Sequence, residues 1–180
     1  MKSFRIPLLA TLLLGASCAF PTSEAPLKKG MQHSNFAFGY WSTTYDSGSS
    51  ETDVDTTMLE VSHGWFFRDD MEAGGRVSYQ NSDTSPGGSD TLWAALAYYR
   101  YYFLGGGSIH PYGEAAVGLG NVDSGGTNDD LTIWSLGIGM LQMMSAYSGL
   151  DAILKYQSVD YDGPASETGF HVELGYSLFW

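Results

Sequence analysis

The segment HVELGYSLFW, residues 171–180, decides the predicted fold of this chain. Its even-numbered positions are large and apolar, whereas its odd-numbered positions from His171 to Ser177 are polar or small. A period of two predicts a β-strand with two different faces. In water, an apolar strand whose edge is not blunted would recruit other chains. In lipid, a closed barrel removes that edge, because the apolar face meets acyl chains and the polar face lines the lumen.

The composition of the chain agrees with a lipid-embedded domain. The 180 residues suffice for one domain, 14% of them are aromatic and 23 are glycine. Charged residues make up 16%, which is below the roughly 25% that is usual for soluble domains. The net charge of -12 argues against a nucleic-acid partner, which would require a basic surface.

The first twenty residues, MKSFRIPLLATLLLGASCAF, predict a secretory signal peptide. Lys2 and Arg5 form a basic region, an apolar run follows, and small residues precede a cleavage site after Ala19. The apolar run is too short to cross about 30 Å of hydrocarbon as a helix. We therefore expect a signal peptide over residues 1–19, a flexible lead-in over 20–32 and an outer-membrane β-barrel domain over 33–180.

The single cysteine, Cys18, leaves a second interpretation of this region open. It follows Gly15-Ala16-Ser17, which resembles a lipoprotein cleavage box but lacks the expected Leu three residues before the cysteine. If cleavage falls after Ala19, the mature chain has no cysteine and cannot form a disulfide.

Eight alternating segments follow, separated by connections of two kinds. The segments are residues 35–45, 56–67, 71–81, 91–104, 112–122, 131–141, 148–159 and 168–180. The long connections 46–55, 82–90, 123–130 and 160–167 are acidic and rich in Gly and Ser, and they alternate with the short connections 68–70, 105–109 and 143–147. This alternation predicts an all-β, eight-stranded antiparallel up-and-down transmembrane barrel, with external loops at one end and tight periplasmic turns at the other. A soluble sandwich explains the alternating residues equally well, but it does not explain the sorted connections.

Large aromatic residues cluster near the predicted strand ends. Trp65, Phe67, Phe103 and Trp180 lie near the periplasmic ends, and Trp93 and Trp134 lie near the external ends. Two such belts are expected where amphipathic rings meet the lipid headgroups.

Three segments resemble a known family. Residues 64–70 (GWFFRDD), 99–103 (YRYYF) and 111–118 (PYGEAAVG) look like the strand-turn-strand signatures of the small outer-membrane β-barrels, which include opacity adhesins and the transmembrane domain of outer-membrane protein A. The resemblance covers essentially the whole mature chain. It implies a porin-like barrel at the cell surface of a Gram-negative-type envelope.

The resemblance also implies an assembly signal in the last predicted strand. Glu173, Gly175, Leu178 and Trp180 match the polar-x-Gly-x-x-apolar-x-aromatic pattern by which that family's barrel assembly machinery recognises a strand. Trp stands where Phe is commoner, and residues 143–147 (MMSAY) form an unusually apolar turn. No peptidoglycan-binding domain follows in this sequence, so a cell-wall tether is not supported.

The sequence gives no clear sign of catalysis or metal binding. A Ser, His and Glu set would resemble lipid A deacylases, but none of the four histidines lies in the His-x-Ser pair of that family. The acidic repeats at residues 51–55 and 128–130 offer oxygen ligands for Ca²⁺, but neither has the spacing of a known loop, and solvated loops are the preferred interpretation. We expect no enzyme activity and no cofactor.

Three charge pairs are predicted to plug the lumen. Facing residues of an antiparallel hairpin have numbers whose sum is constant, so pairs can be read from the centre of each connection. The predicted pairs are Arg100 with Glu114, Lys155 with Glu173, and Glu60 with Arg76. Glu72 and Asp151 face inward at a lower level, where they would share these cations or meet water. The alternative is a wet lumen in which the charged groups have no fixed partners.

These observations favour a monomeric outer-membrane barrel with a structural or adhesive surface role. Its acidic loops would be the working surface, and its partners would be outer-membrane lipid, lipopolysaccharide and an extracellular ligand that the sequence does not identify. The alternative is a narrow channel or a lipid-modifying enzyme of the lipid A deacylase type.

Overall fold

The computed structural model describes residues 27–46, 51–85, 87–103, 107–161 and 166–180. The signal peptide predicted for residues 1–19, with Cys18, lies outside them. The strands are β1 (Gln32–Asp46), β2 (Glu51–Arg68), β3 (Met71–Ser85), β4 (Ser89–Tyr102), β5 (Ile109–Ser124), β6 (Thr127–Ser145), β7 (Ser148–Tyr161) and β8 (Ser166–Phe179). The described residues include no helix that is long and apolar enough to cross a bilayer.

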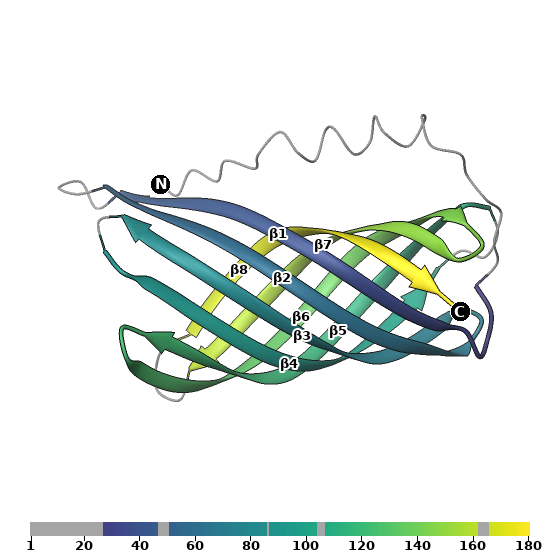
Figure 1. The fold of residues 1–180 in the computed structure, drawn as a ribbon, viewed down its shortest axis with the longest axis horizontal. Coiled ribbons are helices and arrows are strands. Elements are labelled where there is room, and N and C mark those ends of the chain that lie inside the picture. The colour runs from purple at the N-terminus through teal and green to yellow at the C-terminus, as the bar shows by residue number, and fades with distance from the viewer. Residues whose placement is uncertain (1–26, 47–50, 86, 104–106, 162–165) are drawn as a thin grey trace.

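The strands form one closed barrel in chain order, which confirms the predicted fold (Figure 1). Every neighbouring pair is antiparallel, and β1 closes the barrel by pairing with β8. We call the end with the connections β2–β3, β4–β5 and β6–β7 the turn end. The opposite end, with the other four connections, is the rim.

The two faces of each strand differ as the alternation predicts. Inward side chains are buried, whereas outward apolar side chains are exposed all round the barrel. The outward set includes Phe36, Phe38, Leu59, Val61, Val77, Trp93, Tyr99, Val117, Leu119, Leu136, Ile138, Leu154, Tyr176 and Leu178. Since every strand contributes at least one of these residues, the barrel has an apolar belt around its outside.

The acidic connections at the rim are shorter than predicted, and this corrects the sequence interpretation. β1 continues to Asp46 and β2 resumes at Glu51, and only Gly125 and Gly126 separate β5 from β6. The strands contain 14 to 19 residues, whereas about 9–11 tilted residues cross a bilayer. The acidic residues that the structure describes therefore lie mainly on strand extensions at the rim rather than on long loops.

The β5–β6 hairpin turn depends on two glycines. Gly125 and Gly126 have φ values of 62° and 95°, which two-residue hairpin turns require and most side chains avoid. We expect Gly126→Val to lower the free energy of unfolding by about 1–3 kcal/mol. Gly126→Asn should cost much less, because Asn tolerates positive φ. Urea titration of the folded barrel measures both variants, and equal losses would contradict this account.

Residues 27–31 of the predicted lead-in contact the barrel, although Lys28, Lys29 and Gly30 remain exposed. Leu27 is buried in an apolar cluster at the turn end, and Met31 packs against the same cluster. The Gly30 amide donates to the Phe66 carbonyl at 2.7 Å, and the Phe66 amide donates to the Met31 carbonyl at 2.9 Å. The described part of the lead-in thus packs against the apolar cluster at the turn end.

Candidate functional site

A network of charged side chains fills the middle of the barrel. Its cations are Arg76 on β3, Arg100 on β4 and Lys155 on β7, and all three side chains are buried. Glu114 lies 2.6 Å from both Arg76 Nη2 and Arg100 Nε. Lys155 Nζ lies 2.5 Å from Glu173 and 3.3 Å from Glu60, which is also 3.3 Å from Arg76. The six predicted residues therefore meet in one network rather than in three separate pairs.

The strand register explains which predicted pairs are direct. Arg100 faces Glu114, as the hairpin centre predicts. Arg76 instead faces Ser62, and Lys155 faces His171, so each of these registers differs from the prediction by two residues. A shift of two keeps a side chain on the same face. The two ion pairs therefore form diagonally.

Asp151 extends the network toward the turn end. It lies 3.0 Å from Arg100 Nη1 and accepts a hydrogen bond of 2.6 Å from the Tyr112 hydroxyl. The Arg100 guanidinium lies 4.6 Å from the centre of the Tyr112 ring and 5.3 Å from that of Tyr98. Cations and aromatic faces attract one another in this geometry. The sequence analysis missed these tyrosines, although both lie on the inward file of their strands.

Glu72 has different partners from those expected. None of its described contacts is to Arg or Lys; it bonds to His33 at 2.9 Å and accepts hydrogen bonds from the Tyr98 and Tyr102 hydroxyls. The other ring nitrogen of His33 lies 2.9 Å from the Ser177 hydroxyl oxygen. These contacts join β1, β3, β4 and β8 across the lumen.

Ser177, His33 and Glu72 thus stand in the order of a hydrolase triad, which the sequence analysis did not find. All three side chains are completely buried. His33 stacks on Phe179 at 4.6 Å, and Ser177 also accepts a hydrogen bond of 2.9 Å from Asn35. A substrate could reach Ser177 only if the barrel opened. The geometry therefore fits a structural hydrogen-bond network that holds the strands together better than a catalytic centre.

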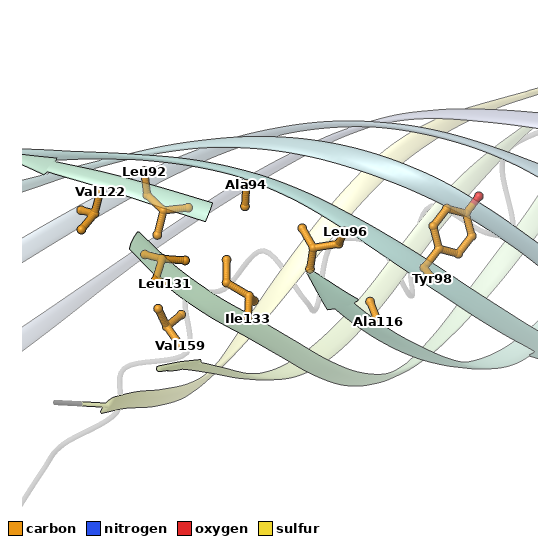
Figure 2. Close-up of a cluster of buried hydrophobic side chains, with 9 residues drawn as sticks. All are labelled: Leu92, Ala94, Leu96, Tyr98, Ala116, Val122, Leu131, Ile133 and Val159. Carbon is orange, nitrogen blue, oxygen red and sulfur yellow. The ribbon is translucent and has the colours of Figure 1, made fainter. Parts of the chain in front are cut away.

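Two clusters of buried apolar side chains lie inside the barrel, one on each side of the charge network. The turn-end cluster consists of Leu27, Phe66, Tyr102, Tyr112, Leu141, Met143, Ile153 and Phe179. The rim cluster consists of Leu92, Ala94, Leu96, Tyr98, Ala116, Val122, Leu131, Ile133 and Val159. Figure 2 shows the rim cluster reaching from β4–β7 into the enclosed space. The polar lining expected from the sequence is therefore limited to part of the lumen.

The remaining predicted residues lie mostly on the outside. Trp65, Trp93, Phe103, Trp134 and Trp180 are exposed, whereas Phe67 is half-buried. In the predicted assembly signal, Leu178 and Trp180 face outward and Glu173 belongs to the charge network. A Cβ on Gly175 would meet the side chain of Asn35.

No metal site is evident in the part of the chain that the structure describes. Three or more His, Cys, Asp or Glu side chains do not converge anywhere among these residues. The acidic repeat at residues 128–130 lies at the β5–β6 hairpin, with Asp129 and Asp130 exposed.

Comparison with solved structures relates the fold to known barrels. No family model and no curated protein sequence matches this chain. The N-terminal β-barrel domain of Pseudomonas aeruginosa OprF is 19% identical, covers 88% of this chain and 100% of its own, and has a TM-score of 0.50. Neisserial surface protein A is 16% identical, with coverages of 84% and 96% and a TM-score of 0.53. Ail of Yersinia pestis is 15% identical, with coverages of 84% and 99% and a TM-score of 0.54. The chain therefore has the fold of the small eight-stranded outer-membrane β-barrels.

Proposed function

We propose that this protein is an integral outer-membrane barrel with a plugged lumen and a structural or adhesive role at the cell surface. The observation that carries this proposal is the apolar belt around a filled interior. A soluble monomer rarely exposes a contiguous apolar patch of this extent. Lipid would cover the belt without any further protein partner.

The distribution of charge supports the rim as the working surface. Lys28, Lys29 and Arg68 lie at the turn end, and the three cations of the network are buried. No other Lys or Arg occurs in the described residues. Among the side chains that the structure describes, the exposed acidic ones at the rim are Asp53, Asp55, Asp83, Asp90, Asp123, Asp129, Asp130, Asp160 and Glu167.

Export and assembly complete the proposal. A cleaved signal peptide would deliver the chain to the periplasm, and the barrel assembly machinery would receive it through the strand that contains Glu173 and Trp180. The folded protein is a monomer in contact with outer-membrane lipid and lipopolysaccharide. These steps rest on the sequence pattern.

A lipid-modifying enzyme is the second candidate, because Ser177, His33 and Glu72 have the hydrogen-bond order of a triad. Burial of Ser177 weighs against it. Labelling of Ser177 by a fluorophosphonate in the folded protein, lost in Ser177→Ala, would favour the enzyme.

Refolded protein should show no steady, well-resolved conductance in planar bilayers. The reason is that ion pairs and two apolar clusters occupy a lumen that is only wide enough for side chains. A conducting porin refolded in the same detergent is the positive control. Reproducible single-channel steps from the unmutated chain would contradict the plug and favour the narrow channel.

A further inference from the structure

The seam between β1 and β8 is bonded along only part of its length. Its ladder joins His33–Gly39 to Glu173–Phe179, although β1 continues to Asp46 and β8 begins at Ser166. On their other sides, β1 is paired with β2 up to Asp46 and β8 is paired with β7 from Ser166. Figure 1 shows the two strands separating toward the rim. The rim therefore contains a split with a strand edge on each side, which we call the seam notch.

Two stacked aromatic rings lie where the β1–β8 ladder ends and the seam notch begins. Trp41 and His171 stack with ring centres 5.1 Å apart, just beyond the last ladder pair. His171 Nε2 also lies 2.8 Å from Glu173 Oε1, so this stack is tied to the charge network. The split thus begins at a defined position above a packed lumen.

Backbone N–H and C=O groups of β8 point into the seam notch. The Trp180 amide donates to Gln32 on β1, whereas the Phe179 amide donates to Tyr147 on the β7 side. The direction of the backbone N–H and C=O groups alternates along a strand. In β8, these groups therefore point toward β1 at the even-numbered residues. At the rim these are Ser166, Thr168 and Phe170, which pair with β7 on one side but with no strand of the described residues on the β1 side.

The inner face of this edge is open. A Cβ on Gly169 would meet no atom within 4 Å. Glu167 is exposed and accepts a hydrogen bond of 3.3 Å from Tyr161, and Phe170 is 53% exposed on the outer face. The edge therefore offers unpaired peptide groups, a carboxylate on one face and an aromatic ring on the other.

We propose that the seam notch binds an extended basic peptide, which adds a strand to β8. Strand addition uses main-chain hydrogen bonds for affinity and alternate side chains for specificity. Basic side chains of the peptide would face Glu167 on the inner side, and apolar ones would face Phe170 on the outer side. The peptide runs antiparallel to β8, since that pairing is slightly more stable per residue. This assignment rests on the proposed function, in which the rim faces the outside of the cell.

A basic occupant follows from the charge of the rim. Asp160 pairs with Ser166 at the start of β8, and Glu167 follows on the same strand. The described residues of the rim contain no Lys or Arg to compete for these carboxylates. A second copy of this chain would bring the same acidic edge into the notch, and like charges facing one another across strands are destabilising.

Fluorescence anisotropy with a labelled peptide tests the assignment. The full chain is refolded into lipid nanodiscs and titrated with fluorescein-labelled Ac-KVKVKVK-amide. The control peptide has the same sequence with every valine N-methylated, which keeps the charge and removes the amide donors from one edge. Binding of the first peptide, and binding about tenfold weaker or absent for the second, is expected.

Two variants at one position locate the site. Thr168→Pro removes a peptide N–H that faces the notch and leaves the pairing of β8 with β7 intact, so the barrel should still fold. It should weaken peptide binding about tenfold, whereas Thr168→Ala should bind like the unmutated chain. Equal heat-modifiable migration of both variants shows that they are folded.

Three results would overturn the proposal. Equal binding of the N-methylated peptide would mean charge attraction alone, and unchanged affinity in Thr168→Pro would place the peptide elsewhere. Dimers that disappear in Thr168→Pro and resist the peptide would identify a second copy as the occupant. Because refolded protein is used, these results are independent of cellular location. Cell fractionation that finds the chain outside the outer membrane would overturn the proposed function without changing the peptide titration.

Discussion

Arg100→Met should lower the free energy of unfolding by about 3–5 kcal/mol, the range for removing one partner of a buried ion pair. Arg100 bonds to Glu114 at 2.6 Å and to Asp151 at 3.0 Å, and its guanidinium lies over the rings of Tyr98 and Tyr112. Methionine fills similar space but leaves two buried carboxylates without this cation. Urea unfolding in detergent, followed by the heat-modifiable band, gives the loss.

A second substitution should recover different amounts of stability at the two carboxylates. Glu114 keeps Arg76 at 2.6 Å, whereas Asp151 has no other cation within ion-pair distance among the described residues. Asp151→Asn should therefore rescue Arg100→Met more than Glu114→Gln does. Each pair is compared with its single variants in a double-mutant cycle. Equal rescue by both, or simple additivity, would show that these groups do not act as one network.

The alternation of residues was enough to predict the number of strands and the direction of their side chains. It was not enough to predict where the strands end at the rim. In segments such as DSGGTNDD, residues 123–130, polar and small side chains remove the apolar signal on both faces. Backbone pairing still continues there, for example between Val122 and Asp129. A solvated strand extension and a loop have similar sequences, so only the backbone hydrogen bonds between strands in the structure distinguish them.

The contacts of the candidate site could be predicted between neighbouring strands of a hairpin, but not between strands on opposite sides of the lumen. Arg100 and Glu114 lie on adjacent strands, so their pairing follows from the turn between them. The contacts from Glu72 to His33, and from His33 to Ser177, join residues that are 39 and 144 positions apart. Their meeting depends on how the barrel closes and on which side chains fill its width. The residue numbers of a single hairpin do not determine these contacts.

Trp180 takes part in closing the barrel at the β1–β8 seam. Its backbone exchanges hydrogen bonds of 2.8 and 3.2 Å with Gln32, and its indole N–H donates to the Gln32 side chain at 3.0 Å. The ring also stacks on His63 at 5.7 Å. Because the β1–β8 ladder is short, these contacts form a large part of what closes the barrel.

Trp180→Asp should therefore reduce the folded, heat-modifiable protein in outer membranes severalfold, and Trp180→Phe should retain most of it. Trp93→Asp is the matched control, since Trp93 and Trp180 are both 56% exposed on the outer face. Trp93 lies on β4, which is bonded to both neighbours along nearly its whole length. If the loss came only from placing a carboxylate in the aromatic belt, the two aspartate variants would fold equally poorly. A selective loss at Trp180 would instead mean that closure of the seam limits the yield of folded barrel.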